Sequence, residues 1–316
     1  MKDHQMETDI PQDRCSDNAI VRRNLAQAGI SVNQTCWEWC TLSLLHSACH
    51  SDSAPVLLLH GVTYSSASVF DLEVPDHERT SYSTLLQLSA RGVDSWALDF
   101  AGYGLSETPD YGRLETPDDY VSQVRRAASE IRALTGKKPV LVGWSWGAQM
   151  ACRTAGAFPS EFAGLAFWGG GWGGSGHLKT WQKRPLPTMQ RRQNTSAHAS
   201  ADFLNPNNYR SEVKDAFVKH ALWLDPTSPT TGITHSILNL PLHSPKSILC
   251  PTLIVHGDGD PVSDKQDMFD FCNELGDNLV GYRIIPNSDH NTQFSESRHI
   301  LFECLTNFTK NIIGDH

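Results

Sequence analysis

The residues most suited to chemistry in this 316-residue chain surround Ser145. They match the pattern G-x-S-x-G, with Gly143 before the serine and Gly147 after it. A serine raised on a strained turn between a strand and a helix leaves no room for side chains at the two flanking positions, which explains both glycines. Because such a turn exposes the serine hydroxyl, we expect Ser145 to be a nucleophile.

The segments beside this pentapeptide are those that the turn requires. A short run of apolar, mostly β-branched residues at 140–142 suits a buried strand, and residues 148–155 have the composition of a helix. The backbone N–H of Trp146 would then lie at the N-terminus of that helix. Unpaired N–H groups and the helix dipole can stabilise a developing oxyanion there. We therefore predict that Trp146 is one of two oxyanion donors.

The second donor is expected in the loop after an earlier strand. Residues 55–59 form a continuous apolar run, typical of a strand in the middle of a parallel sheet, and His60, Gly61 and Val62 follow it. Loops at the carboxyl ends of such strands are where α/β sheets place function. Gly61 frees the backbone to turn inward, and the N–H of Val62 is therefore the candidate second donor.

A serine hydroxyl needs a general base near neutral pH, and the base needs a third group that fixes its tautomer. In folds with this turn, the acid and then the histidine follow the serine, each in a loop after a later strand. The loop after residues 164–168 holds no carboxylate, whereas the loop after His256 holds both Asp258 and Asp260. These two aspartates are alternatives for the acid. His290 lies in the loop after the last expected strand and is the candidate base.

Strands and helices alternate along much of the chain, which predicts an α/β fold with a doubly wound, mostly parallel sheet. Besides the segments above, we expect a strand at 35–45, a strand at 93–100, a helix at 118–134 that ends at Gly136, and a closing helix at 295–312.

The alternation lapses between residues 175 and 247, where prolines interrupt short helical pieces. We interpret this segment as an inserted, mostly helical cap. The predicted division is an N-terminal arm over residues 1–34, a core over residues 35–174 and 248–316, and the cap over residues 175–247. No residue of the cap stands out as a binding residue.

With these residues in place, the chain resembles the α/β-hydrolase family over most of residues 35–312 outside the cap. The resemblance rests on His60-Gly61, the Asp99 to Ser106 turn, the pentapeptide around Ser145, the Gly257 to Val262 loop and Asp289-His290. It implies the α/β-hydrolase fold and a serine hydrolase that needs no cofactor. It also maps the acid onto Asp260 rather than Asp258 and the base onto His290, which gives a triad of Ser145, Asp260 and His290.

The expected reaction is cleavage of a carboxylic ester, thioester or lactone of a small apolar molecule through an acyl-enzyme. Activity should fall at acid pH through the histidine pKa, near 6.5 when unperturbed. The same triad could instead transfer an acyl group, close a lactone or cleave a carbon–carbon bond, depending on whether the cap excludes water. An alternative of another class is a ligand receptor that keeps the fold, and repeated turnover would separate it from an enzyme.

Charge and composition narrow the partners to a small molecule. The formal net charge of −9 disfavours nucleic acids and anionic membranes, since neither would gain from counterion release or surface attraction. The longest apolar run, residues 55–59, is too short to span a bilayer. The N-terminus lacks the apolar run of a secretory signal, so a cytoplasmic location and reduced thiols are expected. The oligomeric state has no sequence signal.

Two further patterns could suggest a bound cofactor, and we reject both. A single strand at 35–45 would separate Cys36 from Cys40 by about 13 Å, which is too far for one metal ion to bridge. The glycine-rich run at 169–176 matches a dinucleotide-binding pattern in two registers, but no acidic residue for a ribose occurs between Glu161 and Asp202. We interpret that run as a flexible hinge.

Overall fold

The computed structural model describes residues 14–38, 40–49, 54–109, 116–174, 178–183, 190–201 and 203–313. The strands of its main sheet are β1 (Ser31–Trp37), β2 (Cys40–Ser47), β3 (Val56–Leu59), β4 (Ser95–Asp99), β5 (Val140–Trp144), β6 (Gly164–Trp168), β9 (Thr252–Gly257) and β10 (Leu279–Ile285). Their spatial order is β1-β2-β4-β3-β5-β6-β9-β10. Neighbours pair in parallel from β4 to β10, whereas β2 pairs antiparallel with both β1 and β4. The predicted mostly parallel α/β sheet is confirmed.

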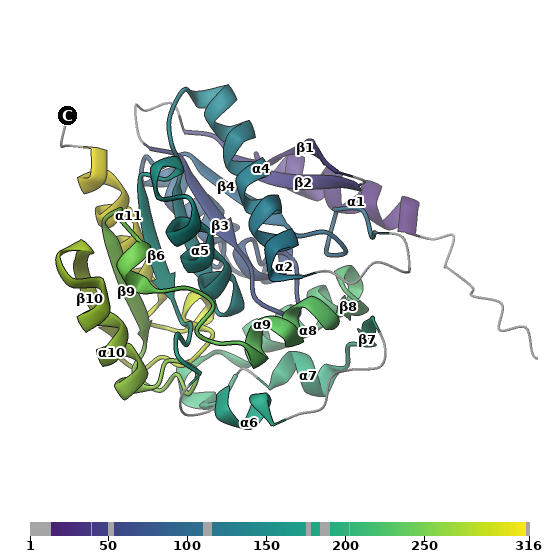
Figure 1. Ribbon diagram of the computed structural model, residues 1–316. Coiled ribbons are helices and arrows are strands. Elements are labelled where there is room, and N and C mark those ends of the chain that lie inside the picture. The colour runs from purple at the N-terminus through teal and green to yellow at the C-terminus, as the bar shows by residue number, and fades with distance from the viewer. Residues whose placement is uncertain are drawn as a thin grey trace, which may run out of the picture.

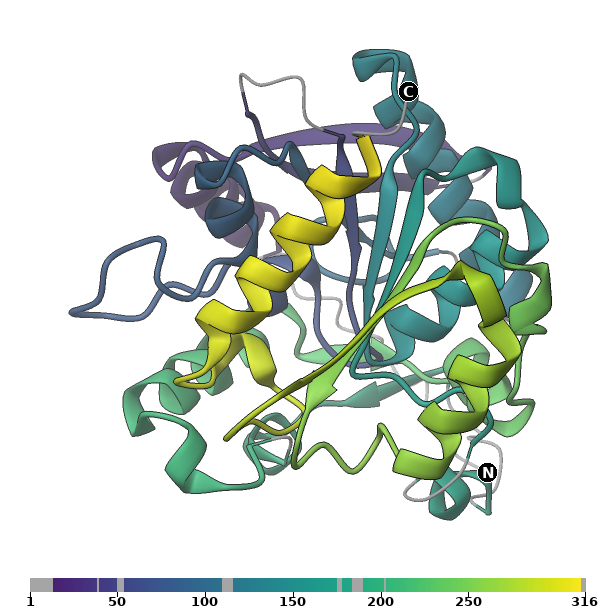
Figure 2. The same cartoon turned by 90° about the vertical axis from the view of Figure 1, so that its left-hand side faces the viewer.

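Helices cover both faces of this sheet (Figures 1 and 2). One face carries α1 (Arg14–Gln27), α2 (Ser66–Phe70), α3 (Thr84–Ala90) and α11 (Arg298–Ile313), and the other carries α4 (Pro117–Thr135), α5 (Trp146–Ala157) and α10 (Lys265–Leu275). Successive residues of the central strands alternate between the two buried clusters: Leu58 and Val142 belong to the first, Leu57 and Leu141 to the second. Burial on both faces explains why these strands read as continuous apolar runs.

The segment between β6 and β9 gathers at one end of the sheet, below the carboxyl ends of the parallel strands (Figure 1). It contains α6 (Leu178–Gln182), β7 (Arg191–Gln193), α7 (Ser196–Ser200), α8 (Ser211–Leu224), β8 (Thr227–Pro229) and α9 (Thr231–Leu238), and β7 pairs with β8 as a small second sheet. We call residues 178–247 the cap. One stripe of α8, made by Val213, Phe217 and Ala221, is buried in the same cluster as the core helices α3 and α11.

Helix α4 shows how local sequence sets the boundaries of an element. The hydroxyl of Thr116 accepts a hydrogen bond from the N–H of Asp119, and the carboxylate of Asp119 accepts one from the N–H of Thr116. This reciprocal pair satisfies two donors that a helix start leaves unpaired. At the other end, Gly136 adopts a left-handed conformation with φ of 73°. The predicted start and stop of this helix are confirmed.

Single 3-10 turns occur at Pro159–Glu161, Pro206–Asn208, Pro245–Ser247, Gly276–Asn278 and Thr292–Phe294.

The expected single strand at 35–45 is wrong. The chain turns back near Glu38, and β1 and β2 form an antiparallel hairpin in which Cys36 lies opposite Thr41. The distance used to reject a metal site therefore rested on the wrong geometry. In the hairpin, Cys36 is exposed and Cys40 is buried. Across the residues that the structure describes, no group of three His, Cys, Asp or Glu side chains could hold a metal ion.

The described N-terminal part of the chain packs on the core. Residues 14–34 include α1 and the first half of β1, and Val21 and Leu25 of α1 are buried in the core. Residues 1–13 lie outside the described part of the chain. Among the described helices, none combines the length and the apolar character needed to cross a membrane.

The glycine run after β6 is tightly packed up to Gly174, which contradicts its interpretation as a flexible hinge. The N–H groups of Trp172 and Gly173 both donate to the carboxylate of Asp267, each at 2.6 Å. A Cβ atom at Gly170 would lie 2.7 Å from the ring of Phe167. These glycines let the backbone approach α10 and β6 closely. Residues 175–177 lie outside the described part.

Candidate active site

Ser145 lies on a strained turn between β5 and α5. Its φ of 59° and ψ of −125° belong to a region that residues with a side chain rarely adopt. The N–H of Ser145 donates to the carbonyl oxygen of Trp168 at 2.9 Å, which ties the turn to β6. A Cβ atom at Gly143 would lie 2.2 Å from the carbonyl oxygen of Gly147, and one at Gly147 would lie 2.2 Å from that of Leu59. The close contacts explain both glycines of the pentapeptide.

Three predicted residues form one hydrogen-bonded row. The Nε2 atom of His290 lies 2.9 Å from Oγ of Ser145, and its Nδ1 atom lies 3.0 and 3.1 Å from the two carboxylate oxygens of Asp260. His290 is 5% exposed and Asp260 7%, whereas Ser145 is half-buried. When Nδ1 carries the proton and donates it to Asp260, Nε2 is free to accept from the serine hydroxyl. This geometry suits removal of the serine proton.

The two aspartates of the β9 loop have different partners. Asp258 accepts hydrogen bonds from the N–H groups of Asn287 and Ser288, both at 3.1 Å, and so shapes the turn that precedes His290. Asp260 contacts the imidazole itself, and the N–H of Val262 donates to its Oδ1 atom at 2.9 Å. The hydrogen bonds therefore distinguish Asp260 from Asp258 as the neighbour of His290.

The two peptides that flank the Cα atom of Val62 are each held by a side-chain hydrogen bond. The Nε2 atom of His60 lies 3.2 Å from the N–H of Phe100, which donates to it, so Nδ1 carries the proton and donates to the carbonyl oxygen of Gly61 at 2.8 Å. The hydroxyl of Tyr103 donates to the carbonyl oxygen of Val62 at 2.6 Å. In a trans peptide the N–H points away from the C=O. The N–H of Val62 is therefore held in a fixed direction. Burial lowers the pKa of His60 to about 4, which keeps the ring neutral.

The two predicted oxyanion donors lie on adjoining turns. Trp146 is the first residue of α5, and a Cβ atom at Gly61 would lie 3.3 Å from Cβ of Ser145. Within the described residues, no acceptor bonds the N–H of Val62 or of Trp146. Both groups are thus free to donate to an oxygen near Ser145.

Asp99 organises the turn after β4. Its Oδ1 atom accepts from the N–H of Ser66 at 2.8 Å and its Oδ2 atom accepts from the N–H of Leu105 at 2.9 Å. A Cβ atom at Gly104 would overlap the carboxylate, at 2.3 Å from Oδ2. Burial raises the pKa of Asp99 to about 7. This turn supports α2 and the loop that follows Val62.

Several residues around the row were not predicted as part of the site. The indole N–H of Trp144 donates to the carbonyl oxygen of His290 at 3.0 Å and so fixes the backbone of the histidine. The hydroxyl of Ser263 lies 3.3 Å from the second carboxylate oxygen of Asp260. Trp144 stands inside the pentapeptide, but the pattern accepts any residue there, and only the three-dimensional contact reveals its partner.

Two buried carboxylates tie the cap to the loops of the site. Asp225, at the end of α8, accepts from the N–H and hydroxyl of Ser65 and from the N–H of Gly104, at 2.7 to 2.9 Å. Asp289, directly before His290, accepts from the N–H groups of Leu204 and Asn205 at 3.1 and 3.0 Å. The cap therefore contacts both the loop of the candidate oxyanion donor and the loop of the candidate base.

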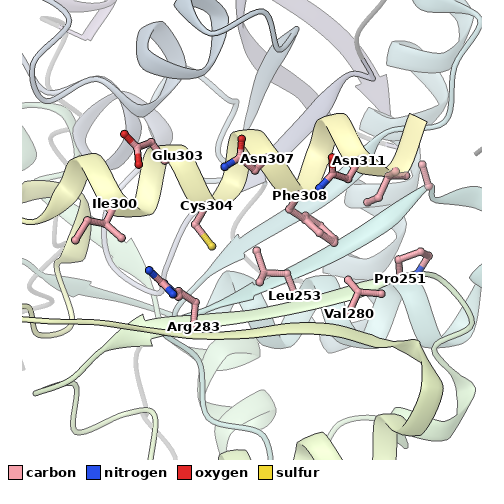
Figure 3. Close-up of a pocket in the computed structure, with 12 residues that line it drawn as sticks. Pro251, Leu253, Val280, Arg283, Ile300, Glu303, Cys304, Asn307, Phe308 and Asn311 are labelled. Atoms are coloured by element: carbon pink, nitrogen blue, oxygen red, sulfur yellow. The ribbon is translucent and has the colours of Figure 1, made fainter. Parts of the chain in front are cut away.

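A groove of about 670 Å³ lies elsewhere, between α11 and the strands β9 and β10 (Figure 3). Ile300, Cys304 and Phe308 of α11 face Leu253 and Val280 across it. Leu253 and Val280 lie at the amino ends of their strands, whereas Ser145 and His290 follow the carboxyl ends of theirs. This groove is therefore separate from the candidate active site.

The chain is similar in sequence to a known curated protein. The mouse (Mus musculus) protein named serine hydrolase BPHL is 26% identical over 188 residues. That match covers 58% of this chain, and the chain spans about 60% of the length of this curated relative.

Two solved structures share the fold. A membrane phospholipase A, described as a bacterial virulence factor, has a TM-score of 0.66 at 18% identity and covers 94% of this chain and 92% of its own. The thioesterase domain from the curacin biosynthetic pathway has a TM-score of 0.62 at 19% identity, covering 87% of this chain and 99% of its own. The sequence profile of the alpha/beta hydrolase family matches residues 56–301. The chain therefore belongs to the alpha/beta hydrolase family.

Proposed function

We propose that this protein is a serine hydrolase that cleaves a carboxylic ester, thioester or lactone of a small apolar molecule. The observation that carries the proposal is the hydrogen-bonded row from Asp260 through His290 to Ser145. The strained turn of Ser145 and the membership of the chain in a family of hydrolases also support the proposal. In this proposal Ser145 is the nucleophile, His290 the general base and Asp260 the group that orients the base.

The proposed reaction has two halves. In the first, Nε2 of His290 takes the proton of Ser145 as Oγ attacks the carbonyl carbon, and the N–H groups of Val62 and Trp146 donate to the oxyanion. The imidazolium then gives the proton to the departing oxygen or sulfur, and an acyl-enzyme remains. In the second half, water attacks the acyl carbon while His290 takes a proton from the water. The imidazolium then gives this proton to Oγ of Ser145, and the acid product leaves.

Two observations support an acyl substrate: the aromatic side chains near the His290 loop and the names of similar proteins. Aromatic side chains from both sides of the site meet beside the loop of His290, namely Tyr64, Phe203, Phe217 and Phe294. This cluster is buried, and it joins cap and core side chains next to the His290 loop. The proteins to which the chain is similar include ones named as a thioesterase and a phospholipase, which is consistent with an acyl group as the reacting unit.

The test is turnover on a matched panel of p-nitrophenyl esters, acyl thioesters and lactones, with wild type, Ser145→Ala and His290→Gln side by side. We expect wild type to release many equivalents of product from at least one class, and both variants to lose at least 10³-fold in kcat. Product analysis in the presence of an alcohol separates hydrolysis from acyl transfer. Release of one equivalent or less by wild type would instead identify a receptor and contradict the proposal.

A further inference from the structure

The loop that carries His290 is fastened to the cap at several points. Both N–H groups of the cap residues Leu204 and Asn205 donate to the same atom, Oδ2 of Asp289. Asp289 is fully buried, and it is joined to His290 by a peptide bond. The carboxylate that receives the cap is therefore one residue away from the candidate base.

Neighbouring contacts continue the same attachment. The ring of Phe203 stacks on the ring of Phe294, with centroids 6.1 Å apart and an angle of 4° between the planes. The N–H of Glu296 donates to the carbonyl oxygen of Asn208 at 3.0 Å. These contacts join one cap segment, residues 203–210, to one core segment, residues 289–296. A shift of the cap segment must displace the His290 loop or break these bonds.

The hydrogen-bonded row of Asp260, His290 and Ser145 leaves little tolerance for such a displacement. His290 makes bonds of 2.9 to 3.1 Å at both ring nitrogens, and a shift of about 1 Å in a reacting group can lower a rate about 100-fold. Its backbone is held on the core side by the indole of Trp144. Asp289 supplies the corresponding support on the cap side.

We propose that Asp289 is a positioning residue, which couples docking of the cap segment to the alignment of His290 with Ser145. This inference rests on the proposed function, since it concerns the rate of the same triad. Asp289 touches neither the serine nor a substrate. It acts through the backbone of His290, and it makes the competent geometry depend on a docked cap.

The hydrogen-bond pattern supplies a conservative variant. Both cap N–H groups donate to Oδ2, while Oδ1 accepts, among the residues that the structure describes, a single long bond of 3.4 Å from the N–H of Asn291. The single carbonyl oxygen of an asparagine can therefore accept both cap donors, whereas alanine accepts neither. Asp289→Asn removes the negative charge and keeps the hydrogen bonds to the cap, whereas Asp289→Ala removes both the charge and the hydrogen bonds.

The experiment measures kcat and KM for wild type, Asp289→Ala and Asp289→Asn on the best ester, with kcat expressed per active site titrated by a fluorophosphonate. We expect Asp289→Ala to lower kcat per site at least tenfold with KM changed less than threefold, and Asp289→Asn to stay within threefold of wild type. A role in stability alone would lower the number of titrated sites and leave kcat per site unchanged, which would overturn the proposal.

Two further variants complete the test. Lys246→Gln is the matched control, because it removes a cap-to-core ion pair of 3.1 Å with Glu274 on the surface, outside both joined segments, and it should stay near wild type. Phe203→Ala loosens the joined cap segment without altering the His290 loop, and it should lower kcat per site even if Asp289→Ala does not fold. An unchanged kcat in Phe203→Ala would contradict the coupling. An inactive wild type would instead remove the proposed function on which the coupling depends.

Discussion

The serine turn and the cap meet at the same site but are held in place by different kinds of contact. Around Ser145, two glycines at fixed spacing allow the turn, and the close contacts come from residues 143–147 and the adjacent strands. The cap is held by carboxylates that bond residues far away in sequence: Asp225 bonds Ser65, 160 positions apart, and Asp289 bonds Leu204, 85 positions apart. The Ser145 turn is therefore specified by local sequence, whereas the position of the cap depends on the assembled fold.

The largest effect should come from a side chain placed in the serine turn. In Gly147→Ala the new Cβ would lie 2.2 Å from the carbonyl oxygen of Leu59 and 2.6 Å from that of His60. Both are backbone atoms of the packed core, so moving them away would cost considerable free energy. We expect a loss of at least about 3 kcal/mol in the free energy of unfolding, together with loss of activity. Urea unfolding followed by tryptophan fluorescence measures it.

Gly136→Ala is the control for this prediction. Gly136 has a φ of 73° but nothing within 4 Å of a Cβ atom, so only backbone strain of about 1 to 2 kcal/mol opposes the alanine. A loss in Gly147→Ala no larger than that in Gly136→Ala would show that the contacts with Leu59 and His60 relax at little cost.

The next effect should come from the cap carboxylates and should differ between them. Asp225 uses both oxygens, Oδ1 for Gly104 and Oδ2 for Ser65, so Asp225→Asn places an amide N–H against a buried donor. We expect Asp225→Asn to lower the free energy of unfolding by about 2 kcal/mol. Asp289→Asn should lower it by less than about 1 kcal/mol, because one oxygen of Asp289 accepts both cap donors.

Chemical unfolding and limited proteolysis of both variants measure this difference. Faster cleavage within residues 178–247 in Asp225→Asn alone would agree with the two bonding patterns. The same loss in both variants would mean that charge, rather than the number of accepting oxygens, decides how the cap is held.

A smaller effect should appear as a pH dependence of the free energy of unfolding, caused by the buried His60. Because His60 has a folded pKa of about 4 against an ordinary 6.5, the unfolded chain binds the extra proton between these values. The stabilisation from neutral His60 is therefore full above pH 6.5 and is lost as the pH falls toward 4. Wild type should lose about 1 kcal/mol from this residue between pH 7 and pH 5.5.

The difference between wild type and His60→Gln isolates this contribution, since glutamine does not titrate. Unfolding free energies at both pH values give one slope for each protein. Parallel slopes would show that His60 keeps its ordinary pKa in the folded chain.

Sequence patterns predicted the core well because the signals there are local. Continuous apolar runs marked the strands buried on both faces, and Gly136 marked the end of α4. The β1–β2 hairpin was missed because its turn contains Glu38 at a positive φ of 42°, where glycine or asparagine would have given a turn signal.

The site was predictable in its residue types but not in all of its partners. Spacing left Asp258 and Asp260 as alternatives, because two carboxylates two positions apart in one loop give the same local signal. The family resemblance favoured Asp260, and the assembled fold places Asp258 in the turn and Asp260 against His290. The roles of Asp225 and Asp289 depend on partners that no spacing rule identifies.

The measurement that tests the central claim most directly is labelling with a fluorophosphonate, with the modified residue mapped by mass spectrometry. If His290 activates Ser145, wild type should carry the adduct on Ser145, Ser145→Ala should carry none, and His290→Gln should label at least 100-fold more slowly. A folded wild type that resists labelling, or an adduct on another residue that persists in Ser145→Ala, would contradict the assignment of Ser145 as an activated nucleophile.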